Sequence, residues 1–238
     1  PSRGLGDVYK RQGITVCNVP LYCVETVAQQ AFALLLELCN HTEKISAATR
    51  GGDWDKAETM SHSTHPLFEL YGKTLGIVGF GHIGQTVARL GAALGMKILV
   101  YSRTKRELPE RYQWAELDAL FKNADVVSLH CPLTDETRGL VNAERLNLMK
   151  PTAFLINTAR GAIVDEAALA EALNSGRIAG AGLDVLVHEP PKKDDPLLAA
   201  KNCIVTPHIA WASRDARARL IKTCLLYTSD AADDRISV

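Results

Sequence analysis

The sequence predicts an α/β protein built on a doubly wound parallel sheet. Short, nearly continuous apolar segments recur along the chain, stretches with helical patterning separate them, and the two kinds of segment alternate from about residue 74 onward. Apolar strands that alternate with helices are typical of a parallel sheet whose two faces are both covered. No internal repeat or low-complexity tract interrupts the alternation.

The region before this alternation is predicted to be simpler. Gly13–Asn18 reads as a short strand that Pro20 ends. Val24–Arg50 is predicted to be one long helix, because alanine and leucine dominate it and neither glycine nor proline interrupts it. The residues "GGDW" (51–54) end this helix, and the polar segment 55–71 is predicted to be a connecting loop.

The alternating region supplies the sheet and its covering helices. Strands are predicted at "TLGIVGF" (74–80), "KILVY" (97–101), "DVVSLH" (125–130), "AFLIN" (153–157), "GAGLDV" (180–185) and "CIVTPH" (203–208). Helices are predicted at His82–Leu94, Trp114–Asn123, Ala143–Met149, Asp165–Asn174 and Ser213–Lys222. Each helix except the last lies between two strands, as parallel connections require.

The two ends of the chain are predicted not to belong to the fold. The DNA segment GATGTGTATAAGAGACAG encodes "DVYKRQ" (7–12). With the base A added in front, its reverse complement CTGTCTCTTATACACATCT encodes "CLLYTS" (224–229) from the second base. One DNA element read on both strands resembles an inserted sequencing adaptor. We therefore expect Pro1–Gln12 and Cys224–Val238 to be adaptor sequence, and we exclude them from functional reasoning.

The remaining chain is expected to be part of a longer gene. Its predicted parts are a remnant of a second domain (13–23), a dinucleotide-binding domain (24–212) and the start of a helix that returns to the second domain (213–223). Any native terminus or targeting signal then lies outside this sequence.

Charge and cysteine content narrow the classes of partner. The sequence has 27 basic and 27 acidic residues, and the two excluded ends remove equal numbers of each. A neutral balance argues against nucleic acid or an anionic membrane as partner, and no apolar run reaches the ~20 residues that span a bilayer. Outside the adaptor the cysteines are scattered and show no metal-binding spacing, which predicts reduced thiols, a cytoplasmic location and no metal site.

A glycine-rich segment predicts dinucleotide binding. "GIVGFGHIG" places Gly79, Gly81 and Gly84 as G-x-G-x-x-G between an apolar strand and an amphipathic helix, the context of a Rossmann-type phosphate site. The first glycine makes the tight turn, the second lets the pyrophosphate approach, and the third lets helix and strand pack closely. His82 and Ile83, at the helix start, are expected to contact the pyrophosphate.

The end of the next strand bears on the choice of cofactor. Ser102 stands 18 residues after Gly84, near the position where a carboxylate would bind the adenosine ribose. Arg103 and further basic residues follow it. A hydroxyl with a guanidinium suits a 2′-phosphate better than a diol, so NADP is favoured over NAD. The alternative is a solvated basic loop that accepts either cofactor.

Three polar residues follow the later strands and predict catalysis. Arg160, Glu189 and His208 each come just past a strand end, where ligands of a parallel sheet collect. A guanidinium can bind the carboxylate and carbonyl oxygens of a 2-keto acid, and an imidazole can exchange a proton with the carbonyl oxygen during hydride transfer. The carboxylate would orient and charge the imidazole. Singly, they could be a helix-cap ion pair, a solvated acid and a buried histidine.

Five ordered segments resemble the D-isomer-specific 2-hydroxyacid dehydrogenases: "GFGHIG", "HCPLTDETRGLVN", "LINTARGAIVDEAAL", "AGAGLDVLVHEP" and "TPHIAWAS". Within that family, "VAQQAFALLLEL" and Trp211 are most similar to glycerate dehydrogenases, also called hydroxypyruvate reductases. The resemblance covers residues 13–223 and implies the roles argued above for the arginine, carboxylate and histidine. Ser102 departs from it, because many members that use NAD carry aspartate there.

The resemblance also implies further contacts. It places the cofactor near Cys131, Pro132, Thr137, Thr158, Ala159 and Asp184. Trp211 is expected to narrow the pocket for a small 2-keto or 2-hydroxy acid, or else to be a packing aromatic. Family members have a second, flavodoxin-like substrate domain and form homodimers, so these 238 residues alone are expected to bind cofactor weakly and turn over little.

Two alternatives stay open. One is another branch of the family, such as a phosphoglycerate or D-lactate dehydrogenase, since Arg160 and His208 are common to the branches; a formate enzyme would have glutamine in place of Glu189. The other is a regulator that senses NAD(H) on the same fold without chemistry.

Overall fold

The computed structural model describes residues 12, 18–63, 65–105 and 107–233. The chain divides into two compact units. One unit is Val24–Trp211, and the other is formed by Pro1–Cys23 together with Ala212–Val238.

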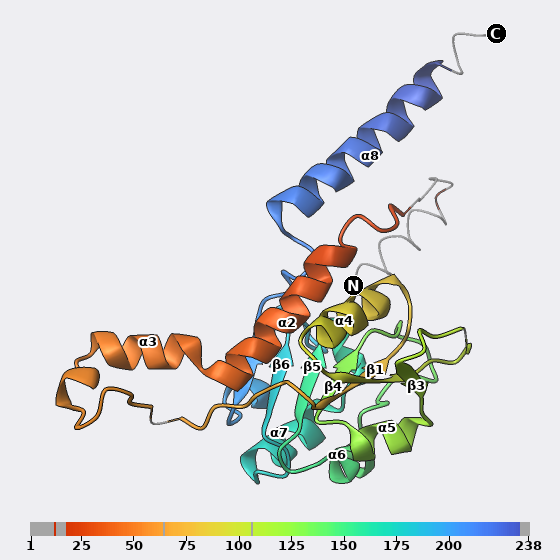
Figure 1. The fold of residues 1–238 in the computed structure, drawn as a ribbon. Coiled ribbons are helices and arrows are strands. Elements are labelled where there is room, and N and C mark those ends of the chain that lie inside the picture. Colours follow the sequence, from red (N-terminus) through yellow and green to blue (C-terminus); the bar gives the residue numbers. More distant parts are fainter. Residues whose placement is uncertain (1–11, 13–17, 64, 106, 234–238) are drawn as a thin grey trace. The chain divides into compact units, whose positions relative to one another are not determined.

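The described residues of the larger unit form a seven-stranded, all-parallel sheet (Figure 1). Its strands are β1 (Thr74–Val78), β2 (Lys97–Tyr101), β3 (Tyr112–Trp114), β4 (Val126–Leu129), β5 (Phe154–Asn157), β6 (Gly180–Leu183) and β7 (Cys203–Val205). Across the sheet they run β3-β2-β1-β4-β5-β6-β7. The order reverses between β1 and β4, and a doubly wound sheet opens its ligand crevice at the carboxyl ends of such a pair. The predicted fold class is confirmed.

Helices cover both faces of this sheet (Figure 1). Helices α2 (Val24–Asn40) and α4 (His82–Ala93) pack on one face, and α5 (Leu117–Asn123), α6 (Ala143–Leu148) and α7 (Glu166–Asn174) pack on the other. Three 3-10 turns complete the described elements of this unit: η1 (Trp54–Lys56), η2 (Gly161–Ile163) and η3 (Pro196–Leu198).

Each helical layer has its own apolar core, because successive strand residues point to opposite faces. In β5, Leu155 belongs to the core under α5, α6 and α7, whereas Ile156 belongs to the core under α2 and α4. Both side chains are at most 1% exposed. Burial of each such side chain contributes about 1.5–3 kcal/mol to folding. The two cores hold the strands in register and so fix where their carboxyl ends meet.

The prediction of one continuous helix over Val24–Arg50 is wrong. Helix α2 ends at Asn40, His41 adopts a left-handed backbone with φ 48°, and α3 (Thr42–Arg50) begins beyond it. The apolar residues explain the break. Helix α2 buries nine residues in the core, whereas α3 buries none, so no packing holds the two on one axis. Asparagine and histidine tolerate the left-handed conformation better than most residues.

The helix predicted for Trp114–Asn123 begins later, at Leu117, and Tyr112–Trp114 form the edge strand β3 instead. Tyr112 pairs with Ile98 of β2, and its ring meets Phe80 edge-on at 6.4 Å. Trp114 pairs with Val100 and also packs edge-on against Phe80. Pairing with β2 therefore outweighs the local helical pattern.

The smaller unit contains α8 (Arg214–Asp233), which includes most of the helix predicted for Ser213–Lys222 and continues past it. Ser213 Oγ accepts a hydrogen bond from Ala216 N at 3.1 Å near the start of the helix. Arg219 Nε donates to Tyr22 O at 2.9 Å, so the two end segments of the chain contact each other. All but the last residue of the strand predicted at 13–18 lies outside the described residues.

None of the helices described for this chain is both long enough and apolar enough to cross a membrane.

Candidate functional site

The glycine loop, which contains Gly79, Gly81 and Gly84, joins β1 to the start of α4. The surroundings of the three glycines differ. Gly79 has φ +97°, and a Cβ there would lie 2.6 Å from Cys131 N. A Cβ on Gly84 would lie 2.1 Å from the carbonyl oxygen of Gly79, so the helix packs directly on the turn. Gly81 differs, because a Cβ there would meet nothing within 4 Å. The protein itself does not require glycine at 81, which leaves open space for a ligand.

The start of α4 is suited to an anion. Its N-cap is Gly81, which offers no side-chain cap, and its first turn contains no acidic residue. The first backbone hydrogen bond into the helix is from Gln85 N to Gly81 O, so the N–H groups of His82, Ile83 and Gly84 have no intrahelical acceptor. Free N–H groups and the positive helix end together bind phosphate. The space at Gly81 and these donors fit a dinucleotide.

The turn after β4 borders the glycine loop. Cys131 lies against Gly79, and burial raises the pKa of its thiol to about 11, so the thiol is neutral and does not repel a phosphate. Thr137 closes the turn: its hydroxyl donates to Pro132 O at 2.6 Å and accepts from Thr134 N at 2.8 Å. The turn containing Cys131, Pro132 and Thr137 therefore lies beside the glycine loop. The Thr137 hydroxyl is already hydrogen-bonded within this turn.

The end of β2 flanks the same loop on its other side. Gly79 N donates to Tyr101 O at 2.8 Å, so the end of β2 contacts the glycine loop. Half-buried Ser102 and exposed Arg103 follow Tyr101 directly. The pKa of Glu136 is lowered, first by a hydrogen bond from Thr134 and by its own backbone, and least by the Arg103 charge. Arg103 therefore lies near the turn after β4.

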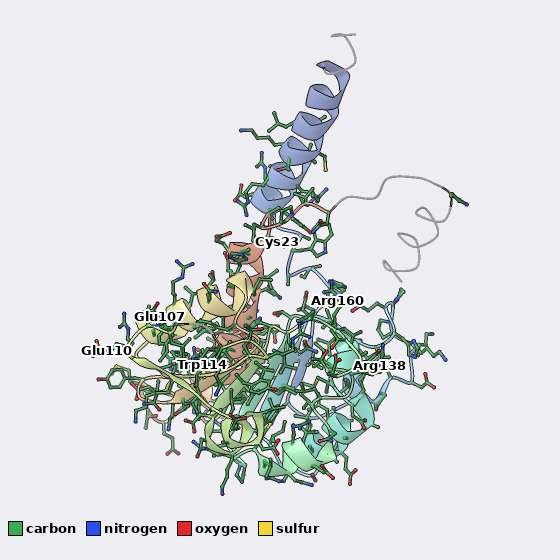
Figure 2. All side chains as sticks on the ribbon, turned by 90° about the vertical axis from the view of Figure 1, so that its right-hand side faces the viewer. Cys23, Glu107, Glu110, Trp114, Arg138 and Arg160 are labelled. Carbon is green, nitrogen blue, oxygen red and sulfur yellow. The ribbon has the colours of Figure 1, made fainter. Side chains whose placement is uncertain are left out.

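The turn after β5 presents Arg160 and is built by Asn157. Buried Asn157 donates from Nδ2 to Arg160 O at 2.9 Å and accepts from Ala159 N at 3.0 Å. Arg160 itself is exposed (Figure 2), and its Nη1 donates to Ala159 O at 2.6 Å. Thr158 is 8% exposed, and its buried hydroxyl has no hydrogen-bond partner among the described residues. Such an orphaned group fits a ligand that would bind it.

Glu189 and His208 form a close pair at the ends of β6 and β7. The distance from His208 Nδ1 to Glu189 Oε2 is 2.6 Å. The His208 side chain is 41% exposed and the Glu189 side chain 30%. The other carboxylate oxygen, Oε1, accepts from Leu186 N at 3.0 Å. With Nδ1 committed to the carboxylate, Nε2 is the ring atom left for proton exchange with another molecule.

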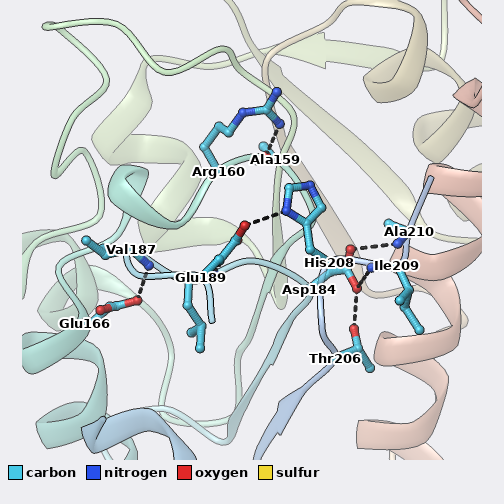
Figure 3. Close-up of polar contacts among 11 residues, drawn as sticks. Ala159, Arg160, Glu166, Asp184, Val187, Glu189, Thr206, His208, Ile209 and Ala210 are labelled. Carbon is cyan, nitrogen blue, oxygen red and sulfur yellow. Dashed lines mark hydrogen bonds and ion pairs between the residues drawn. The ribbon is translucent and has the colours of Figure 1, made fainter. Parts of the chain in front are cut away.

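Direct backbone packing joins the Arg160 turn to the Glu189 loop. A Cβ on Gly161 would lie 2.0 Å from the carbonyl carbon of Leu186, so only glycine fits there. Figure 3 shows Arg160 near the Glu189–His208 pair, and within the described part of the chain no hydrogen bond or ion pair links its guanidinium to either of them. β5, β6 and β7 are consecutive neighbours, so all three side chains emerge at one sheet edge. The arrangement offers a cation and a proton donor to a small anion.

Asp184, at the end of β6, supports the His208 turn. Its carboxylate accepts from Thr206 Oγ1, from Ile209 N at 3.1 Å and from Ala210 N at 2.8 Å (Figure 3). The backbone carbonyl of Asp184 accepts from His208 N at 2.8 Å. The residue is 1% exposed. These bonds hold His208 at φ 54°. The contact with a cofactor implied for Asp184 stays a prediction, as does the pocket role of half-buried Trp211.

Sequence reasoning missed the supporting roles of Asn157, Glu166 and Thr206. Each bonds to a turn that carries a predicted site residue, and only the turn geometry reveals this. Among the residues that the structure describes, no group of three His, Cys, Asp or Glu side chains is arranged to hold a metal ion.

Comparison with known proteins places this arrangement in a family context. Residues 32–210 match the family model described as D-isomer specific 2-hydroxyacid dehydrogenase, NAD binding domain. Hydroxypyruvate reductase of Blautia hydrogenotrophica is 45% identical over 214 residues, which cover 89% of this chain and 66% of that protein. Glycerate dehydrogenase of Methylorubrum extorquens is 42% identical over 209 residues, covering 87% of this chain and 65% of that protein. The chain thus spans less than two thirds of the length of these relatives.

Solved structures of other proteins are also similar to this chain. D-lactate dehydrogenase from Aquifex aeolicus, complexed with NAD and lactic acid, is 36% identical with a TM-score of 0.82, and the match covers 97% of this chain and 73% of that one. An acyclic imino acid reductase in complex with NADPH and D-Arg is also 36% identical, with a TM-score of 0.80 over 94% of this chain and 71% of that one.

Proposed function

The chain belongs to the D-isomer specific 2-hydroxyacid dehydrogenase family, and from that premise we propose that its protein is an NAD(P)-dependent oxidoreductase. It would transfer a hydride between the nicotinamide and a small 2-keto or 2-hydroxy acid, reducing hydroxypyruvate to D-glycerate or glyoxylate to glycolate. The observation that carries the proposal is the 2.6 Å contact between His208 Nδ1 and Glu189 Oε2, beside the Arg160 turn and on the sheet that holds the glycine loop.

The cofactor would be held by the glycine loop. Gly81 leaves room for the pyrophosphate, the N–H groups of His82 and Ile83 would bind it, and the Thr158 hydroxyl is available to the ligand. When bound, the nicotinamide supplies or accepts the hydride.

The chain's own residues would do the rest. Arg160 would bind the substrate carboxylate and orient the carbonyl, since a guanidinium donates two parallel hydrogen bonds to such a group. His208 would give a proton from Nε2 to the carbonyl oxygen as the hydride arrives, and it would take that proton back in the reverse direction. Glu189 would accept from Nδ1–H of His208, which would leave Nε2 directed to the substrate.

The chain is proposed to be the cofactor-binding part of a longer enzyme. The chain matches less than two thirds of the length of its relatives, which supports this proposal. The contact between its two end segments also supports it, since the predicted second domain would be built from both of them. The missing domain would close over the nicotinamide. A homodimer and a cytoplasmic location stay predictions.

An absorbance assay of NADH and NADPH oxidation tests the reaction. The protein with its substrate-side domain is expected to reduce hydroxypyruvate or glyoxylate faster than pyruvate, whereas the 238 residues alone should bind cofactor weakly and show no turnover. Strong reduction by the 238 residues would refute the proposed incompleteness. Faster reduction of pyruvate would favour the D-lactate branch, which the Aquifex structure supports. Cofactor binding without turnover of any 2-keto acid would favour an NAD(H)-sensing regulator.

The choice of cofactor gives a second prediction. Ser102 and the exposed Arg103 favour NADPH, so the substitution Ser102→Asp is expected to shift the kcat/KM ratio toward NADH by roughly tenfold or more, because a carboxylate accepts from the ribose diol and repels a 2′-phosphate. The ratio is measured with both cofactors, and Ser213→Asp, in the smaller unit, is the matched control. A native protein that strongly prefers NADH would contradict the proposed NADP preference.

A further inference from the structure

The loop that carries Glu189 is hydrogen-bonded to a residue outside the loop. Leu186 N donates to Glu189 Oε1, which is a bond within the loop. Val187 N instead donates to Oε1 of Glu166 at 2.7 Å (Figure 3). Glu166 is the first residue of α7, six positions after Arg160. This bond therefore ties the Glu189 loop to the helix that follows the Arg160 turn.

Helix α7 does not need the Glu166 carboxylate for its own start. Asp165 is the N-cap and accepts from Ala168 N at 3.1 Å. Capping by Asp165 satisfies a free N–H of the first turn, so Glu166 is available for another partner. Its partner is the backbone of a loop 21 residues away.

The position is unfavourable for an acid, which indicates a specific role. The pKa of Glu166 is raised mainly by burial, and Asp195 and Asp165 add to the rise, while the bond from Val187 and the His188 charge oppose it. Glu171, another acid on α7, is by contrast exposed to solvent.

The fit between the two segments leaves little tolerance. Gly161 packs against the backbone of Leu186 so closely that a single added carbon would overlap it. The Glu189–His208 contact is likewise short, at 2.6 Å. A displacement of the loop by about 1 Å would break the hydrogen bond, because a donor–acceptor distance of about 3.6 Å no longer makes one.

We propose that Glu166 is a positioning residue, which holds the 186–189 loop through Val187 N–H so that Glu189 keeps the His208 ring in its Nδ1–H tautomer. This proposal rests on the proposed function for its catalytic meaning, since the tautomer leaves Nε2 for the substrate. Its structural content can be tested without turnover.

Nitrogen-15 NMR of the 238-residue chain tests it. In the native chain, His208 is expected to show the Nδ1–H tautomer when its ring is neutral, and the Val187 amide is expected to exchange slowly. In Glu166→Met, which keeps the size of the side chain but lacks an acceptor, Val187 should exchange roughly tenfold faster or more, and the ring should become a mixture of tautomers. Glu166→Gln retains an acceptor oxygen and should restore both signals. Glu171→Met is the matched control on the same helix.

The outcomes separate the two proposals. If Val187 exchange rises in Glu166→Met while the His208 tautomer is unchanged, Glu166 is only a structural tie and the positioning role is overturned. The same holds if neither signal changes, and Glu166→Ala supplies the comparison if methionine disturbs folding. A changed tautomer supports the positioning role even if no 2-keto acid is reduced, in which case only the proposed function fails.

Discussion

Replacing His208 with glutamine in the protein that includes its substrate-side domain is expected to lower kcat/KM for hydroxypyruvate by about 10²–10⁴-fold, the range of general acid catalysis. Glutamine cannot carry a transferable proton at the position of the imidazole. It also ends the short contact with Glu189, which orders the ring. Because His208 lies after β7 and the glycine loop after β1, cofactor binding should be unchanged.

Two measurements check this expectation. Steady-state kinetics give kcat/KM, and fluorescence titration with NADH or NADPH gives cofactor affinity. His62→Gln is the matched control, because His62 is an exposed histidine in the 55–71 segment and lies outside the three predicted catalytic residues. If the His208→Gln variant keeps more than about a tenth of native kcat/KM, His208 is not the general acid of the reaction.

The second large effect separates two glycines of one loop. Gly81→Ala is expected to weaken cofactor binding roughly tenfold or more, because its methyl group enters the space proposed for the pyrophosphate. The free energy of unfolding should stay the same or rise by up to about 1 kcal/mol, since Gly81 has φ −78° and a Cβ there meets no protein atom.

Gly84→Ala should behave in the opposite way. Its Cβ would lie 2.1 Å from the Gly79 carbonyl oxygen, a backbone atom that cannot move alone, so the free energy of unfolding should fall by about 1–3 kcal/mol or more. Urea unfolding and cofactor titration of both variants make the comparison. Native cofactor affinity in Gly81→Ala would show that the dinucleotide does not occupy this cradle.

Local patterns carried most of the fold. Apolar runs such as "KILVY" are visible in a few consecutive residues, and β2 matches its predicted bounds at Lys97–Tyr101. The glycine loop was predictable for the same reason, since the spacing of three glycines between strand and helix depends on nothing distant. Chain order alone put Arg160, Glu189 and His208 at strand ends, and parallel strands bring such ends to one edge.

Other features depended on contacts that no local window contains. The break at His41 follows from which part of Val24–Arg50 finds a core to pack on, and β3 follows from pairing with β2. The 2.6 Å approach of Glu189 to His208, and the bonds from Asn157, Asp184 and Glu166 that support it, join residues from different turns.

The sequence by itself thus determined the doubly wound sheet, the phosphate cradle and the candidate catalytic residues, because periodicity and spacing are properties of neighbouring positions. Only the tertiary structure decided how the turns are held against one another. Hydrogen bonds and close packing between segments far apart in the chain depend on distances that folding sets.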